Sequence, residues 1–447
     1  MIRFIFPSGA SSLKKRSYSD MANESDNPKL AVLVGGGPAP GINGVIHSAT
    51  IEAINHGIEV IGIYDGFEHL MEGELESKPL TINDVSRIHL NGGSILRTSR
   101  ANPTKSDAAL KNCVLALMDA GVTYLLAIGG DDTAYSASRV AAYARESMGV
   151  IIKTVHVPKT IDNDLPLPEE IRTFGFETAR ELGTRIVMNL MEDALTGHRW
   201  YLVVTMGRKA GHLALGIGKS SGATITLIPE EWAGREIRLQ EVVDILTTSM
   251  LKRLAEGKPY GVALVAEGVV EQMSRQDLDM LDDVERDAHG HILLSEINFS
   301  DILKKTLRKQ LQELGINKRI INKDMGYELR CADPIAFDID YTRSLGEAAV
   351  SYLLEGGSEA TITIQQNQVV PLPFEKMMDP ETGRMEIRQV NIDSFTYCSA
   401  YKFMIRLKPQ DANDTVLLAK MAAQTNLSTE AFKERFGYLL GIAPRPF

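Results

Sequence analysis

Short apolar runs alternate with longer amphipathic stretches along most of the chain. Leu30–Val34, Tyr124–Ile128 and Gly261–Ala266 are apolar runs of five or six residues, the usual length of a strand. Further strands are predicted at Glu59–Ile63, Gly149–Val157, Trp200–Thr205 and Thr224–Ile228, and helices at Gly41–His56, Asp132–Glu146, Lys209–Lys219, Glu241–Ala255 and Ser300–Leu314. Strands that are apolar on both faces and alternate with helices form parallel sheets covered by helices. The chain is therefore predicted to have an α/β fold with mostly parallel sheets.

The length of the chain predicts the number of domains, and its composition disfavours several classes of partner. The chain has 447 residues, which favours two domains over one core. Lys and Arg number 48 and Asp and Glu 58, and the balance of 48 − 58 = −10 disfavours nucleic acid or an anionic membrane as partner. No window has 18 uninterrupted apolar residues, and the three cysteines, Cys113, Cys331 and Cys398, form no CxxC pair. These features predict a soluble cytoplasmic protein without a zinc site.

Two segments depart from the alternating pattern. Residues 1–28 combine a short apolar start, a basic cluster and a remainder rich in Ser and Asn. A disordered tail is predicted there; a targeting peptide is the alternative, which Asp20, Glu24 and Asp26 disfavour. The stretch 271–297 is acidic and polar and is predicted to be a surface insertion.

Three unusual patches directly follow predicted strands: Gly35–Asn43, Gly129–Thr133 and Pro158–Asp164. Ligands of open parallel sheets bind beyond the carboxyl ends of the strands, so the three patches are expected to assemble one site. In the first patch, glycines allow backbone N–H groups to approach an anion at the start of a helix. A tight strand-to-helix turn without a ligand is the alternative for that patch.

The second and third patches carry groups that suit phosphoryl chemistry. Asp131 and Asp132 follow two glycines and could hold a phosphate-bound Mg²⁺, or one of them could cap the next helix. Lys159, Asp162 and Asp164 lie together in the third patch. Phosphoryl transfer to an alcohol needs a base for the hydroxyl proton and cations for the phosphate oxygens, and this patch offers both. A polar turn capped by Asx side chains is the alternative.

Two arginines flank the predicted strand Trp200–Thr205. Arg208 follows it in Met206-Gly207-Arg208-Lys209 and is a natural bidentate partner of phosphate. Arg199 precedes it, and an extended strand of this length separates the two guanidinium groups by roughly 23 Å. One subunit therefore cannot bring both to one phosphate, so Arg199 serves either the surface or the site of a neighbouring subunit.

Together these motifs resemble the phosphofructokinase family. They occur in the family's order between about Leu30 and Leu354, namely Gly36–Asn43, Gly129-Gly130-Asp131, Pro158–Asp164, Met206-Gly207-Arg208, Glu267 and Gly326-Tyr327-Glu328-Leu329-Arg330. The resemblance implies two Rossmann-like, three-layer domains that exchange chain segments near Phe174 and Arg330. The implied phosphoryl-donor domain is 29–174 plus about 331–395, and the implied sugar-phosphate domain is 175–330 plus about 396–447.

The resemblance also implies roles for individual residues. Asp162 resembles the family's general base, Asp131 its Mg²⁺-binding aspartate and Glu267 its acceptor of sugar hydroxyls. Tyr327 and Arg330 match positions that hold the 6-phosphate. The implied catalytic residues are Asp162, Lys159, Asp132 and Arg208, and further implied substrate contacts are Gly36, Arg100, Thr160, Ile161, Asp164, Met206 and Gly207.

Asp132 and Lys159 predict the phosphoryl donor. ATP-using members usually have glycine at both positions, whereas Asp132 adds bulk and negative charge where the α-phosphate of ATP would lie, and Lys159 adds an ammonium near the transferred group. The combination resembles the pyrophosphate-dependent branch, which reversibly phosphorylates the 1-hydroxyl of fructose 6-phosphate in glycolysis with Mg²⁺. Arg199 matches an arginine that reaches a neighbouring subunit's site, which implies a homodimer or homotetramer.

Three alternatives to this function remain from the sequence. The first is an ATP-dependent 6-phosphofructokinase, and the second is a pyrophosphate enzyme that prefers sedoheptulose 7-phosphate. The third is a non-catalytic regulatory subunit that only binds sugar phosphates. Such a subunit is expected to lose the base or the metal ligand, whereas Asp131, Asp162 and Arg208 are all present.

Overall fold

The structure is a computed structural model that describes residues 28–207, 209–279, 297–382 and 385–442. The chain divides into two units, Met1–Ala179 with Tyr327–Arg388 and Arg180–Gly326 with Gln389–Phe447. The predicted tail lies almost wholly outside the described residues, and so does most of the predicted insertion at 271–297. None of the helices in the described part combines the length and apolar character that crossing a bilayer requires.

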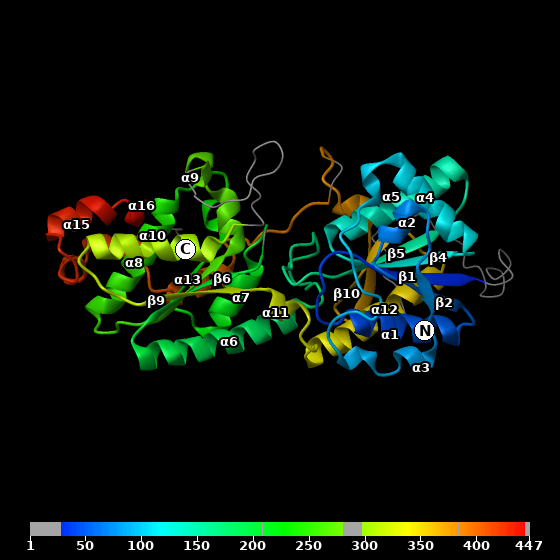
Figure 1. The fold of residues 1–447 in the computed structure, drawn as a ribbon, viewed down its shortest axis with the longest axis horizontal. Helices are drawn as coiled ribbons and strands as arrows, with labels where there is room; N and C mark the ends of the chain where they lie inside the picture. The colour runs from blue at the N-terminus through cyan, green and yellow to red at the C-terminus, as the bar shows by residue number, and fades with distance from the viewer. Residues whose placement is uncertain (1–27, 208, 280–296, 383–384, 443–447) are drawn as a thin grey trace. The chain divides into compact units, whose positions relative to one another are not determined.

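The first unit is built on a seven-stranded sheet in the order β11-β10-β5-β4-β1-β2-β3 (Figure 1). Its strands are β1 (Lys29–Val34), β2 (Glu59–Ile63), β3 (Ser77–Pro79), β4 (Tyr124–Gly129), β5 (Lys153–Pro158), β10 (Ala360–Gln365) and β11 (Gln368–Pro373). The inner strand pairs are parallel, whereas β3 and β11 close the two edges in antiparallel orientation. The predicted α/β class with mostly parallel pairing is confirmed.

Helices cover both faces of this sheet because its central strands are apolar on both sides. Alternate residues of β1 point to opposite faces. One set packs against α1 (Ile42–Asn55) and α12 (Ala336–Leu354), and the other against α2 (Glu68–Glu72), α4 (Asp107–Asp119) and α5 (Asp131–Met148), as Figure 1 shows. The first set consists of Leu30, Val32 and Val34. The second set consists of Ala31 and Leu33.

The register of the central strands brings three strand ends to one edge of the sheet. Val34 pairs with Ile128, and Gly129 pairs with Pro158, so β1, β4 and β5 end level with one another. The chain segments that follow these three strands therefore leave the sheet as neighbours.

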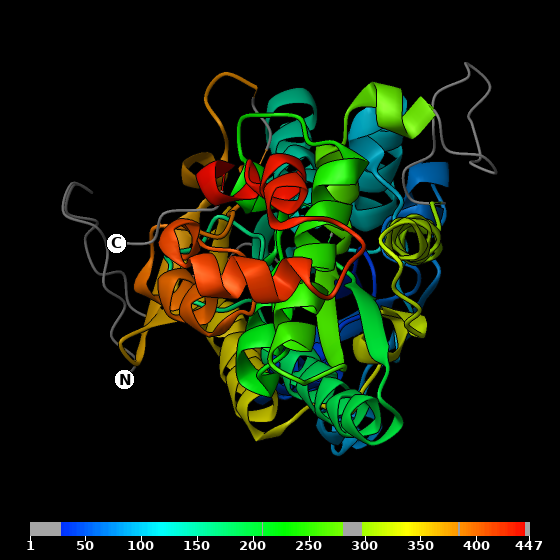
Figure 2. The ribbon, with the colours of Figure 1, turned by 90° about the vertical axis from the view of Figure 1, so that its left-hand side faces the viewer.

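The second unit holds a four-stranded, fully parallel sheet in the order β7-β8-β6-β9. Its strands are β6 (Trp200–Thr205), β7 (Ile225–Leu227), β8 (Gly261–Ala266) and β9 (Ile320–Met325). A large apolar cluster joins this sheet to α8 (Leu239–Ala255), α10 (Phe299–Glu313) and the C-terminal helices, which Figure 2 shows in orange to red. The C-terminal helices of this cluster are α14 (Thr415–Ala422), α15 (Thr429–Phe436) and α16 (Leu439–Ile442).

A smaller cluster in the second unit joins α7 (His212–Ser221) to α13 (Phe395–Phe403). The remaining α-helices among the described residues are α3 (Ile82–Val85), α6 (Phe176–Gly197), α9 (Arg275–Asp279) and α11 (Tyr327–Arg330).

Four strands, β3, β9, β10 and β11, are absent from the sequence prediction, and β5 is shorter than predicted. The reasons can be identified for β5 and β9. The strand predicted at Gly149–Val157 begins only at Lys153, because Gly149 ends α5 in the left-handed conformation, with φ of 67°. The apolar pattern does not reveal β9, because Ile320 and Met325 are its only buried residues.

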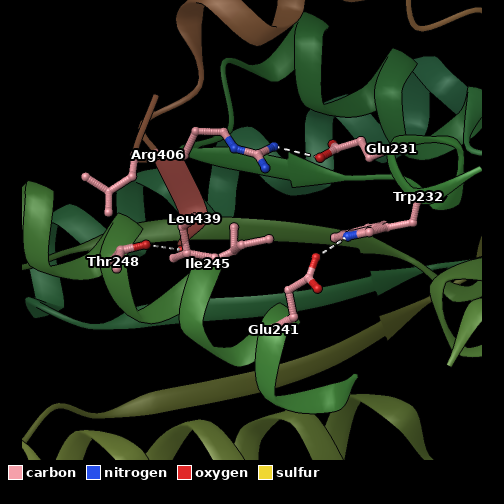
Figure 3. Close-up of a pocket in the computed structure, with 8 residues that line it drawn as sticks. Glu231, Trp232, Glu241, Ile245, Thr248, Arg406 and Leu439 are labelled. Carbon is pink, nitrogen blue, oxygen red and sulfur yellow. Dashed lines mark hydrogen bonds and ion pairs between the residues drawn. The ribbon is translucent and has the colours of Figure 1, made fainter. Parts of the chain in front are cut away.

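The C-terminal segment of the second unit is fastened by a buried ion pair (Figure 3). Arg406 Nη1 lies 2.8 Å from Glu231 Oε2, and these side chains are only 4% and 1% exposed. Next to this pair, Trp232 Nε1 donates to Glu241 Oε1 at 2.5 Å. Because an unpaired buried charge is costly, this pair holds the segment around Arg406 to the element that contains Glu231.

Asp338 of α12 anchors the start of α6 in the first unit. Its carboxylate is fully buried and accepts hydrogen bonds from Gly175 N at 2.9 Å, Thr178 N at 2.9 Å and Thr178 Oγ1 at 2.5 Å. Gly175 has φ of 89°, a conformation that favours glycine. The carboxylate therefore fixes the point at which the chain turns from the end of its long loop into α6.

We expect Asp338→Ala to lower the free energy of unfolding by about 3 kcal/mol, because it leaves buried donors without their acceptor. Asp340→Ala removes an exposed carboxylate from the same helix and is the matched control, with an expected change within about 0.5 kcal/mol. Urea unfolding followed by circular dichroism measures both variants. Equal stability of the two would show that Asp338 does not anchor α6.

Candidate active site

Three backbone hydrogen bonds hold the strand-end segments of the first unit together. Gly35 N donates to Ile128 O at 2.9 Å, and Lys159 N donates to Gly129 O at 2.8 Å. Gly36 N donates to Ser99 O at 2.8 Å, which brings in the segment that contains Arg100. The predicted glycine turn, the end of β4 and the segment after β5 are thus tied to one another at this edge.

The turn after β1 requires glycine at position 36. Gly36 has φ of 83°, and a side chain there would begin 3.1 Å from Lys159 Nζ. The Thr98 hydroxyl donates to Gly36 O at 2.6 Å, and Lys159 Nζ donates to Gly37 O. The turn is therefore closely packed against the ammonium group of Lys159.

Lys159 is the centre of the charged cluster. Its side chain is only 3% exposed, and burial lowers its pKa to about 8, with Arg330 and Arg100 acting in the same direction. Asp162 and Asp164 oppose that shift. The ammonium group is still mostly protonated at neutral pH, so an acidic protein gathers three cations and two carboxylates here.

Asp162 lies in an irregular segment, Lys159–Thr173, which we call the Asp162 loop. Thr160 Oγ1 accepts a hydrogen bond from Asp162 N at 3.0 Å, and the Thr173 hydroxyl donates to Thr160 O at 2.7 Å. Asn163 has φ of 55°, a left-handed conformation that is uncommon outside glycine. The tight turn at Asn163 presents Asp162 and Asp164 from one short stretch of backbone, and Asp162 Oδ1 is shielded from solvent.

Asp131 and Asp132 are the first two residues of α5, directly after β4. The N-cap of α5 is Gly130, so neither carboxylate caps the helix, which removes that alternative. Carboxylates in the first turn interact favourably with the helix dipole. Carboxylate oxygens are the ligands that Mg²⁺ prefers, so these two residues could hold this ion.

Sequence reasoning missed His156, which lies fully buried on β5. Its Nε2 lies 2.9 Å from Gly129 O and its Nδ1 lies 2.9 Å from Thr361 Oγ1. A carbonyl can only accept, so Nε2 donates the proton. Burial lowers the pKa of His156 to about 4, and the neutral ring therefore links the end of β4 to β10.

Arg330 belongs to the same cluster, whereas Tyr327 lies at its exposed rim. A side chain built on Gly37 would begin 3.3 Å from Arg330 Cζ, so this guanidinium lies against the glycine turn. Tyr327 is 80% exposed, and Arg330 Cζ lies 5.4 Å from the centre of its ring.

Five other predicted site residues belong to the second unit. Met206 and Gly207 follow β6, and Glu267 follows its neighbour β8, so these three lie at one edge of that sheet. Gly207 has φ of 139°, and its carbonyl accepts a hydrogen bond from Gly268 N at 3.2 Å. Arg199 precedes β6 at the opposite edge, where its Nε lies 3.5 Å from Asp193 Oδ2. Arg208 lies outside the described residues.

The chain is similar to known phosphotransferases over nearly its whole length. The family model described as phosphofructokinase matches residues 29–353. A pyrophosphate–fructose 6-phosphate 1-phosphotransferase of Thermotoga maritima is 51% identical over 414 residues, which cover 91% of this chain and 98% of that protein. One of the same name from Naegleria fowleri is 47% identical over 423 residues, covering 92% and 96%.

The fold is also similar to solved structures. A pyrophosphate-dependent phosphofructokinase from Nitrosospira multiformis matches with a TM-score of 0.64 over 90% of this chain and 91% of that one. The sequence identity is 15%, so this likeness concerns the fold alone.

Proposed function

The chain belongs to the phosphofructokinase family, and we propose that it transfers a phosphoryl group from pyrophosphate to the 1-hydroxyl of fructose 6-phosphate. The buried ammonium group of Lys159 carries this assignment. It lies against the glycine turn and within the field of Asp162, where a small, highly charged donor needs a cation. Asp132 at the start of α5 disfavours the α-phosphate of ATP by charge and bulk.

Asp162 is the proposed general base. It accepts the proton of the 1-hydroxyl as that oxygen attacks the phosphorus of pyrophosphate, and inorganic phosphate leaves with the electrons of the broken P–O bond. Lys159, Arg100 and the backbone of the Gly36 turn hold the phosphate oxygens and neutralise their charge. Pyrophosphate and the sugar ester differ little in transfer potential, so the reaction runs in both directions.

The sugar-phosphate contacts are proposed from the family resemblance. Arg208 and Glu267 hold the sugar, with Met206 and Gly207 shaping the pocket, and Tyr327 and Arg330 hold the 6-phosphate. Thr160, Ile161 and Asp164 position the substrate beside Asp162. Arg199 serves the site of a neighbouring subunit in a homodimer or homotetramer.

A metal ion is part of the proposal. Asp131 is the residue that would hold Mg²⁺, which supplies positive charge to the oxygens of pyrophosphate when it is bound. The chain's own residues supply the base and the remaining cations.

A donor assay tests the proposed function. Fructose 6-phosphate and Mg²⁺ are incubated with either pyrophosphate or ATP, and fructose 1,6-bisphosphate is measured. We expect turnover with pyrophosphate to exceed turnover with ATP by at least about 10²-fold, the value of one well-placed charge contact in such a site. Replacing fructose 6-phosphate with sedoheptulose 7-phosphate ranks the two acceptors by kcat/KM.

Two other outcomes would contradict the proposal. Turnover with ATP alone would mean that Asp132 and Lys159 do not set the donor. The absence of turnover with either donor would favour a regulatory subunit that only binds sugar phosphates.

A further inference from the structure

Arg388, the last residue of the first unit, places its whole guanidinium group against the backbone of the Asp162 loop. Its Nε and Nη2 donate to Asn163 O at 3.1 and 2.9 Å, and Nη2 also donates to Asn163 Oδ1 at 2.5 Å. Its Nη1 donates to three further carbonyls of the loop, Leu167 O at 3.1 Å, Pro168 O at 2.9 Å and Ile171 O at 2.8 Å. The backbone N–H of Arg388 donates to Asp164 O at 2.8 Å.

The loop needs such a donor because it supplies few of its own. It has no regular structure between Lys159 and Ile171, and the prolines at 166 and 168 have no N–H group. The side chains of Leu165, Leu167 and Ile171 pack in an apolar cluster with Phe374 and Met377. Pro168 O also accepts a hydrogen bond from Ile171 N at 2.9 Å, whereas the other carbonyls that Arg388 binds would lose this donor if Arg388 were absent. A buried carbonyl that loses its donor is costly.

Asn163 connects the hydrogen bonds of Arg388 to the two neighbouring carboxylates. It is buried, it holds the strained left-handed conformation, and it lies between Asp162 and Asp164 in the chain. Its Oδ1 also accepts a hydrogen bond from Thr173 N at 3.1 Å, so the amide bridges the two ends of the loop. Both oxygen atoms of Asn163 are therefore bound by one guanidinium group.

The charge of Arg388 suits this position. Burial lowers its pKa to about 10, with Arg172 acting in the same direction and Asp164 opposing, so it stays protonated at neutral pH. Lysine in its place would offer a charge but not the planar fork that reaches several carbonyls at once.

We propose that Arg388 is a positioning residue for phosphoryl transfer: it fixes the backbone at Asn163 and thereby sets where Asp162 and Asp164 present their carboxylates. This inference rests on the proposed function, because it assumes that Asp162 is the base. Arg388 binds backbone and an amide side chain, so its effect on the reaction passes through the loop.

Kinetics of Arg388→Ala test the proposal. We expect kcat to fall by about 10²-fold, the effect of a small misplacement of a reacting group, while the KM values of both substrates change less than about threefold. Guanidinium chloride at millimolar concentration is expected to restore part of kcat. Arg388→Lys keeps the charge without the fork, and we expect its kcat to lie between those of the wild type and Arg388→Ala.

Arg172→Ala is the matched control, since Arg172 lies on the same loop and its side chain is 43% exposed. We expect wild-type kcat and no response to guanidinium for this variant. Hydrogen exchange of the Asp162 loop provides a readout besides activity: it should accelerate in Arg388→Ala and slow again with guanidinium.

Three results would overturn the proposal: an unchanged kcat in Arg388→Ala, a loss of kcat that guanidinium does not restore, or unchanged exchange in the loop. If the wild type uses ATP instead of pyrophosphate, the proposed donor is wrong, but the same comparison of kcat and KM can be made with ATP. Failure of the two proposals can therefore be told apart.

Discussion

Replacing Asp162 with serine is expected to lower kcat by about 10³-fold and to leave the KM values of both substrates within about threefold. Serine retains an oxygen atom in the loop, but its hydroxyl cannot accept a proton at neutral pH. The backbone N–H of Asp162 donates to Thr160 Oγ1, and the variant keeps this hydrogen bond.

Steady-state kinetics in both reaction directions measure this effect. Asp107→Ser, which removes an exposed carboxylate from the start of α4 in the same unit, is the matched control and should keep wild-type kcat. An increase in KM with an unchanged kcat would assign Asp162 a role in binding and leave the base unidentified.

Replacing Lys159 with methionine is expected to lower kcat/KM for pyrophosphate by about 10² to 10³-fold, the effect of one lost charge contact in a preorganised site. Methionine has a similar length and fills the buried space, so the loss of charge dominates. Lys153→Met is the matched control, because Lys153 begins β5 whereas Lys159 directly follows the other end of this strand. Equal kcat/KM for the two variants would remove Lys159 from the donor site.

The wild type should also show a pH dependence that Lys159→Met lacks. The pKa of Lys159 is about 8, and a bound anion favours the protonated form. Affinity for pyrophosphate is therefore fully present below pH 8 and falls above it, by up to tenfold per pH unit, as the ammonium deprotonates. Taking the ratio of wild type to variant at each pH removes the ionisation of pyrophosphate itself. A flat ratio between about pH 7 and 9 would contradict the assignment.

The parts of the molecule that follow local rules could be predicted from the sequence. The apolar runs predicted β1, β4, β6 and β8 to within one residue at each end, because strands buried on both faces carry their own pattern. The motif Pro158–Asp164 indicated a functional segment at the Asp162 loop, because Lys, Thr and two carboxylates follow a strand there.

The supporting contacts could not be predicted, because they join residues that are distant in the sequence. Arg388 binds Asn163 across 225 residues, and His156 binds Thr361 across 205. Neither Arg388 nor His156 stands in a motif, and a single arginine in a polar stretch is most often exposed. Their partners include backbone carbonyls, and because every residue has one, the sequence does not indicate which carbonyl is bound.

The order in which the chain is made has a consequence for the first unit. Strands β1, β4 and β5 are synthesised before the second unit, whereas β10, β11 and Arg388 follow only after residues 180–326. The nascent chain therefore carries Asp131, Lys159 and Asp162 for a long interval without the sheet edge and the guanidinium that complete their surroundings. Contacts between residues so far apart in the sequence form slowly. A chain released from the ribosome before residue 388 would therefore have an unformed site.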